Sequence, residues 1–107
     1  MANFGGMGNI FKQAQEMQAK LARVQEELGR RTVEASSGGG MVRVTVTGQL
    51  ALSAIKIDPS VVNPQEMEML EDLVLAATNE GLRLAREMAA EEMGKITGGM
   101  KIPGLTP

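Results

Sequence analysis

Apolar residues recur in steps of three and four through the first quarter of the chain. No glycine or proline occurs between Gly8 and Gly29, and the remaining positions there are mostly good helix formers. The apolar positions are Met7, Ile10, Ala14, Met17, Leu21, Val24 and Leu28. This spacing predicts a helix over residues 7–28 with a narrow apolar seam. Gly29 is predicted to stop it.

The period then changes from helical spacing to alternation. Val33 and Ala35 alternate with polar residues, and so do the valines of VRVTVT at 42–47, which predicts two half-buried strands joined by a hairpin loop, SSGGG, at 36–40. Gly48-Gln49 suits a type II′ turn. A third strand is expected over about 50–58, with Ile55 and Ile57 facing the core. The three strands should form an antiparallel meander.

A second helix is predicted after the sheet. Asn63 can cap it, Pro64 fits its first position, and Glu66 can complete a capping box. The apolar positions that follow are Met67, Leu70, Val74, Ala77, Gly81, Leu84 and Met88. Gly81 either weakens this helix or allows another backbone to approach it closely. The predicted fold class is α+β: a long N-terminal helix, a three-stranded antiparallel meander and a long C-terminal helix.

Both helices are longer than the sheet between them. At the usual helical rise, residues 7–28 span about 33 Å, whereas a seven-residue strand spans roughly 23 Å. A second helix that continued to about Lys95 would span about 48 Å. Apolar seams that overhang their own core need a second chain to cover them, so we infer a homodimer. The alternative is that the first seam packs on its own sheet with frayed ends. The predicted interface positions are Met17, Leu21, Val24, Leu28, Leu84 and Met88.

Composition narrows the chemistry available to this chain. Its 107 residues include nine methionines and two phenylalanines, but no cysteine, histidine, tryptophan or tyrosine. Thiol and imidazole catalysis and zinc sites that use those ligands are therefore excluded. We expect one domain over 1–97 and a Gly/Pro-bearing tail over 98–107. No long apolar run or leader pattern occurs, which predicts a cytoplasmic protein without a membrane partner.

The carboxylates do not form a recognisable catalytic or metal site. Glu87 and Glu91 stand four residues apart on one helix face, a spacing that could hold a cation, but no third ligand converges on them. The glycine pairs lack the context of a nucleotide-binding loop. We therefore expect solvated helix charges, no catalytic residue, no metal or other cofactor, and no small-molecule substrate.

Basic side chains offer a different possibility. The net charge is −2, which argues against a simple polycation. Lys12, Lys20 and Arg23 nevertheless lie opposite the apolar seam, where Glu16 and Glu27 offset part of their field. Two copies of such a helix in a dimer could contact DNA phosphates from two places. Without tryptophan or tyrosine, base stacking of the usual kind is not expected.

Five segments in order resemble the YbaB/EbfC family of nucleoid-associated proteins over nearly the whole chain. They are GGMGNIFKQAQEMQAKL, VRVTVTG, IKIDPSVV, MLEDLVLAATNEG and GGMKIPGL. The resemblance implies a bacterial homodimer with helices that project like the arms of tweezers. It also implies binding to double-stranded DNA that alters DNA conformation, with roles in nucleoid organisation, gene regulation and DNA protection. The DNA contacts it implies are Lys12, Lys20, Arg23, Arg83 and Arg86.

Two other functions remain open from the residues alone. The helical seams and methionine-rich surfaces could bind a protein partner in DNA repair or replication, with little affinity for DNA. An enzyme is a distant third possibility, because the sequence offers no pair of nucleophile and base. The leading hypothesis is a non-enzymatic protein of the nucleoid that contacts DNA phosphates and recognises DNA shape.

Overall fold

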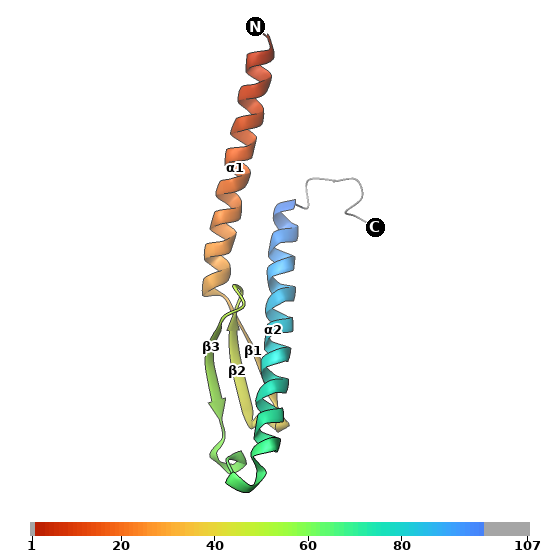
Figure 1. The fold of residues 1–107 in the computed structure, drawn as a ribbon. Coiled ribbons are helices and arrows are strands. Elements are labelled where there is room, and N and C mark those ends of the chain that lie inside the picture. Colours follow the sequence, from red (N-terminus) through yellow and green to blue (C-terminus); the bar gives the residue numbers. More distant parts are fainter. Residues whose placement is uncertain (1, 98–107) are drawn as a thin grey trace, which may run out of the picture.

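The computed structural model describes residues 2–97, with side chains over 8–96, and has the α+β architecture expected. Helix α1 (Ala2–Arg30) leads into a sheet of β1 (Thr32–Ser37), β2 (Val42–Thr47) and β3 (Leu52–Ile57), and α2 (Met67–Thr97) follows (Figure 1). The predicted tail at 98–107 lies outside the described residues.

The sheet is the predicted antiparallel meander, with the strand order β1-β2-β3. Val42, Val44 and Val46 of β2 are fully buried, while the residues between them point to the opposite face. Helix α2 covers the valine face and packs mainly on β1 and β2. Alternation in the sequence therefore identifies the buried face of the central strand correctly.

The start of α2 follows the predicted capping pattern in part. The side-chain oxygen of Asn63 accepts a hydrogen bond from the backbone N–H of Gln65, at 3.0 Å. Pro64 then opens a single 3-10 turn, Pro64–Glu66, before the α-helix begins at Met67. The helix thus starts three residues later than the proline suggests, although Asn63 caps the same segment.

Close packing explains Gly81. A Cβ added at Gly81 would lie 2.7 Å from Cγ2 of Val46 and 3.0 Å from Cγ2 of Val44. Ala77 and Ala85, one turn to either side, are completely buried. These small side chains let the axis of α2 approach the sheet, so the close-approach interpretation of Gly81 is correct.

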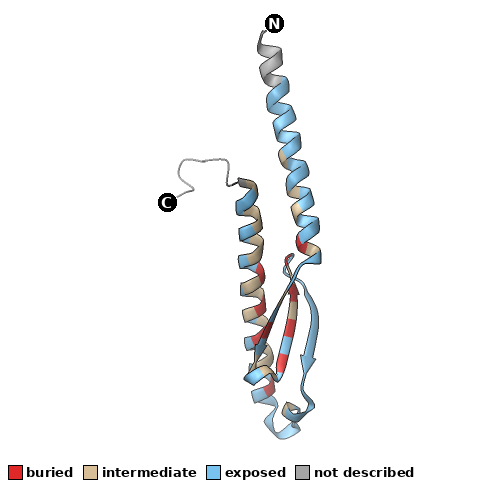
Figure 2. Ribbon diagram, turned by 180° about the vertical axis from the view of Figure 1, so that it is seen from behind, coloured by how far each residue is buried: buried red, intermediate tan, exposed pale blue. Residues whose placement is uncertain are grey.

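Most of α1 extends beyond the sheet, as the length mismatch predicts (Figures 1 and 2). The radius of gyration is 20.8 Å, whereas a compact 100-residue domain has about 13 Å. Along α1, Met17, Leu21 and Val24 are half-buried and Leu28 is buried, while Ile10 remains exposed. Only the C-terminal half of the apolar seam is thus covered within the chain.

Gly29 does not end α1, contrary to prediction. The helix continues to Arg30, and the N–H of Arg31 still donates to the carbonyl of Glu27 at 3.1 Å. The backbone N–H of Gly48 donates to the carbonyl of Leu28 at 2.9 Å. An element distant in sequence thus satisfies a carbonyl of the last turns, so the left-handed glycine cap is not needed.

The predicted type II′ turn at Gly48-Gln49 is also wrong. The N–H of Leu50 donates to the carbonyl of Thr47, and Leu50 itself has φ 64°, so the loop is a three-residue connection with a left-handed third residue. Gly48 is required for another reason. A Cβ there would lie 2.7 Å from the carbonyl oxygen of Leu28, against which the turn packs.

Strand β3 differs from the expected core strand. Ile55 pairs with Val44 and Ile57 with Val42, so both isoleucines share the valine face of the sheet. However, they are 48% and 39% exposed, because α2 does not extend over β3. The prediction gave the correct face but the wrong burial: within one chain, this part of the face has no cover.

Candidate nucleic-acid interface

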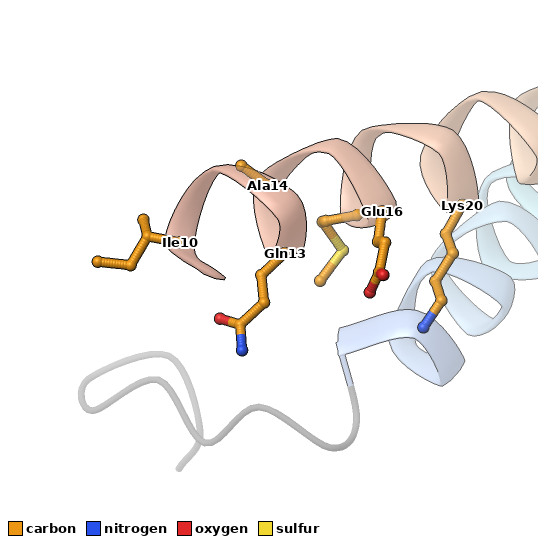
Figure 3. Close-up of a pocket in the computed structure, with 6 residues that line it drawn as sticks. Ile10, Gln13, Ala14, Glu16 and Lys20 are labelled. Atoms are coloured by element: carbon orange, nitrogen blue, oxygen red, sulfur yellow. The ribbon is translucent and has the colours of Figure 1, made fainter. Parts of the chain in front are cut away.

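The projecting part of α1 carries three unpaired cations. Lys12, Lys20 and Arg23 are exposed, and none forms an ion pair within residues 8–96. Helical spacing places Lys12 and Arg23 on the side of α1 opposite the apolar seam. Lys20, which was predicted to lie there too, is about a quarter turn from the seam and lines the same surface as Ile10 and Met17 (Figure 3). Glu16 lies among them, without an ion pair to any of them in the described structure. The cations are therefore free to meet a negatively charged partner, and Glu16 weakens their field.

Unlike the cations of α1, Arg83 is bound to acidic side chains. Its guanidinium donates to Glu80 at 2.5 Å and to Glu87 at 2.6 Å. The hydrogen bond from Arg83 lowers the pKa of Glu80, and the bond to Glu80 raises the pKa of Arg83. Two carboxylates thus offset this cation, whereas Arg86 is exposed without an ion pair among residues 8–96. Of the two implied DNA contacts on α2, only Arg86 has an unengaged charge.

An ion pair also links α2 to the residue that follows α1. Arg31, just after α1, binds Glu92 of α2 at 2.5 Å, and Lys95 binds the same carboxylate at 3.1 Å. The hydrogen bond from Lys95, and next that from Arg31, lowers the pKa of Glu92. This contact helps to hold the base of α1 against α2 and so orients the projecting part.

The outer face of the sheet contains a cationic pair that the sequence analysis did not identify as a unit. Arg43 of β2 and Lys56 of β3 are direct cross-strand neighbours, and both are exposed. Alternation alone places each of them on the outward face. Their juxtaposition depends on the register of β2 against β3, which is set by the three-residue loop together with a one-residue register shift between Thr45 and Val46.

An apolar surface lies on the opposite face, between β3 and the first half of α2. We call it the β3–α2 face. It contains a groove of about 420 Å³ and several exposed large apolar side chains. The groove is lined by Ile57, Met67, Leu70, Glu71, Val74, Leu75 and Thr78. Leu75 is 60% exposed and Met67 44%. Such a continuous apolar surface is typical of an interaction site.

The predicted interface positions occupy a second region, where α1 meets the C-terminal half of α2. Leu28 is 1% exposed and therefore already covered within the chain. Met17, Leu21, Val24, Leu84 and Met88 are half-buried. They retain some exposed surface that a partner could contact, but the β3–α2 face has larger exposed apolar side chains. The sequence analysis missed this face because it assigned Ile55 and Ile57 to the core.

Acidic side chains of the described residues were candidates for a metal site. Over the described range, no group of three or more acidic side chains is placed to hold a metal ion. Glu87, half of the possible cation-binding pair, is bound to Arg83. No helix in the same range is long and apolar enough to cross a membrane.

Comparison with known proteins gives a consistent result. The model of the YbaB/EbfC DNA-binding family matches residues 3–100. A nucleoid-associated protein of Syntrophobacter fumaroxidans is 56% identical over 97 residues, which cover 91% of this chain and 88% of the relative. One from Moorella thermoacetica is 57% identical over 102 residues, which cover 92% and 98%. Both names describe a nucleoid-associated protein and neither describes an enzyme.

The fold has a solved counterpart. The crystal structure of the uncharacterized protein HP0035 from Helicobacter pylori aligns with a TM-score of 0.75 at 22% identity, covering 83% of this chain and 94% of that one. At this identity the likeness concerns the fold alone. It supports the arrangement of a long helix, a three-stranded sheet and a second long helix.

Proposed function

Because the chain belongs to the YbaB/EbfC DNA-binding family, we propose that it binds double-stranded DNA as a homodimer and alters DNA conformation. In this role it would act in the nucleoid, within the cytoplasm, and contribute to nucleoid organisation, gene regulation and DNA protection. The observation that carries the proposal is the row of unpaired cations on the projecting part of α1, in a chain of this family.

The phosphate backbone is the target that fits these side chains. Lys12, Lys20 and Arg23 spread along α1 over about 16 Å of axial rise, and charges on duplex DNA repeat every ~3.4 Å along each strand. Arg86 can add a contact, while Arg83 would have to exchange its carboxylate partners first. Contacts of this kind position a protein on DNA without reading its bases, so recognition would depend on shape and deformability.

We propose that the homodimer forms through the β3–α2 face. Ile55, Ile57 and Leu75 are the kind of exposed side chains that a second copy would bury, and Glu71 is the sole charged residue of the groove lining. The half-buried seam positions on α1 and α2 would extend the contact. A dimer presents two copies of the α1 cations, so both can engage one duplex and raise the overall affinity.

The first test is duplex binding across a salt series. If the dimer neutralises about four to six phosphates, the logarithm of affinity should fall with the logarithm of salt concentration at a slope of roughly −4 to −5. Fluorescence anisotropy of a labelled duplex measures this directly. A slope near zero would refute phosphate contact as the basis of binding.

Charge reversal locates the contact on α1. Changing Lys20 and Arg23 together to Glu should abolish binding at moderate salt, because two attractive charges per chain become repulsive. A matched control changes Arg30 and Lys95 to Glu, which alters the net charge equally at residues that the structure already pairs with Glu26 and Glu92. Equal loss in both double variants would point to net charge instead of an α1 contact.

The same variants distinguish the second candidate, a protein-interaction module in DNA repair or replication. That function is favoured by the size of the β3–α2 face, which a protein partner could occupy. If the unmodified protein fails to bind DNA even at low salt while remaining folded, the interaction function replaces the DNA-binding one. Partner binding should then survive the charge reversal on α1.

A further inference from the structure

We propose that the outer face of the sheet is a second DNA contact, separate from α1, at which Arg43 and Lys56 together bind one phosphate of the duplex. The proposal rests on the proposed function and adds a place on the chain that engages DNA. The two side chains border an open hollow of about 330 Å³. The hollow is lined by Gly40, Met41, Arg43, Lys56, Ile57 and Asp58.

The position of the two cations is unfavourable for the sheet itself. Arg43 and Lys56 are directly opposite each other on neighbouring antiparallel strands, where Cβ atoms are about 5 Å apart. Like charges in this arrangement repel each other and destabilise the strand pair. Neither side chain forms an ion pair within residues 8–96 that would offset the repulsion. An anion bound between them would offset it.

The glycine loop before β2 positions Arg43. Nε of Arg43 donates to the carbonyl of Gly40 at 3.3 Å, which leaves both terminal nitrogens of the guanidinium without a partner among the described residues. Gly40 has φ 92°, and a Cβ there would lie 3.3 Å from Nη2 of Arg43. Glycine thus provides the turn and the room that the guanidinium occupies. The two terminal nitrogens remain available for the forked contact that arginine makes with phosphate oxygens.

The side chains around the pair allow a DNA backbone to approach. Lys56 is exposed, and its ammonium group is carried on a flexible stem that can reach the phosphate bound by Arg43. On the same face, Ser36 is the cross-strand partner of Arg43, and Ala54 lies two residues before Lys56. Both of these side chains are small and exposed. The hydroxyl of Ser36 can add a hydrogen bond, as serines commonly do at DNA phosphates.

Two carboxylates near the pair weaken its field without binding either cation. Glu34 of β1 borders a second hollow together with Arg43 but has no ion pair within residues 8–96. Asp58 accepts a hydrogen bond from the backbone N–H of Ser60 at 2.8 Å, which lowers the pKa of Asp58. Asp58 is thus engaged in the turn after β3. The surface is therefore suited to a single phosphate contact and not to general attraction of DNA.

The outer face stays open in the proposed homodimer. Lys56 lies between Ile55 and Ile57, whose side chains point to the opposite face, so a second copy on the β3–α2 face leaves Lys56 uncovered. The strands run in nearly the same direction as α1 (Figure 1). Along this direction Arg23 and Arg43 are about 28 Å apart, which corresponds to about eight base pairs. One duplex that lies along the chain could therefore contact both.

Removal of the two charges tests the proposal by duplex binding across a salt series. Arg43→Gln with Lys56→Gln in the full-length chain should weaken binding about tenfold at moderate salt. The salt slope should become shallower by about 2, because the dimer then neutralises one phosphate fewer in each chain. Glu34→Gln should have the opposite effect and strengthen binding about threefold, since it removes a negative charge beside the same phosphate.

The matched control is Arg30→Gln with Lys95→Gln. It removes the same net charge at residues that the structure pairs with Glu26 and Glu92, so it should weaken binding less than about twofold and leave the slope unchanged. Equal losses in the two double variants would overturn the proposal in favour of a net-charge effect.

A different failure would identify another occupant of the outer face. If the unmodified protein binds the duplex and Arg43→Gln with Lys56→Gln binds it equally well, the duplex does not contact this face, and an acidic protein partner becomes the occupant to test. If the unmodified protein does not bind the duplex at all, the proposed function fails first. The two failures are therefore distinguished by the unmodified protein in the same titration.

Thermal unfolding provides a second measurement that does not involve DNA. Because Arg43 and Lys56 repel each other, the double variant should unfold at the same temperature as the unmodified protein or at a higher one. Circular dichroism at one protein concentration measures the midpoint. A clear fall in the midpoint would show that the pair stabilises the sheet, and this result would overturn the proposal.

Discussion

Replacing Gly81 with leucine should destabilise the protein by about 3 kcal/mol or more, an effect at the upper end for overpacked cores. Even a Cβ at this position would lie 2.7 Å from Val46 and 3.0 Å from Val44. Both valines are fully buried on the central strand, so they cannot turn out into solvent to avoid the new side chain. The substitution therefore forces α2 away from the sheet and opens the main core of the chain.

Urea denaturation followed by circular dichroism measures this change, at one protein concentration because dimerisation shifts apparent stability. Gly94→Leu is the matched control: Gly94 lies in the same helix, and a Cβ there would meet nothing within 4 Å. Leucine at Gly94 should be neutral or stabilising by up to ~1 kcal/mol, because glycine is a poor helix former. Equal midpoints for both variants would contradict the close-packing explanation.

The same contrast shows what the sequence could predict. The apolar periodicity located both helices, all three strands and the overhang of α1, because these follow from local patterns and simple lengths. It did not decide the role of Gly81, since a glycine in a helical pattern has the same local signature whether it faces solvent or a strand. Only the position of α2 over Val44 and Val46 distinguishes the two cases.

The errors in the predicted fold have a common physical cause. Gly29 and Gly48 were both interpreted from their own neighbourhoods, as a helix stop and as a turn residue. In the structure the end of α1 packs against the β2–β3 loop, where Gln49 bonds the carbonyl of Gln25 and Gly48 provides room for Leu28. Contacts between segments distant in sequence decided both conformations, and periodicity contains no information about them.

The candidate site was predictable only in part, for a similar reason. In the structure Lys12, Lys20 and Arg23 all lack ion pairs in the described range, but Lys20 lies beside Ile10 and Met17 at the edge of the apolar seam. The sequence analysis placed all three opposite that seam. It could not show that Arg83 is held by two carboxylates, because many exposed charges at this spacing remain unpaired. Nor could it show that α2 leaves β3 uncovered, which depends on where the helix crosses the sheet.

Replacing Ile55 with aspartate should convert the proposed homodimer into a monomer. A two-fold interface uses the same patch on both chains, so one substitution places two carboxylates in an apolar contact. A penalty of about 2 kcal/mol for each would weaken association roughly a thousandfold. Because Ile55 is already 48% exposed in the single chain, the fold of each chain should tolerate the change.

Light scattering after size exclusion, with a dilution series, gives the mass directly. The unmodified protein should have twice the chain mass of 11.4 kDa, and Ile55→Asp should have the single mass at the same concentration. Ala54→Asp is the matched control, since Ala54 is the neighbouring exposed residue of β3 and points to the outer face beside Thr45. It should remain dimeric.

If Ile55→Asp stays dimeric while Leu21→Asp does not, the interface lies on the α1 seam instead of the β3–α2 face. Because a monomer has half the α1 cations, loss of the dimer should also weaken duplex binding, which links the apolar face of the sheet to the function of the projecting helix.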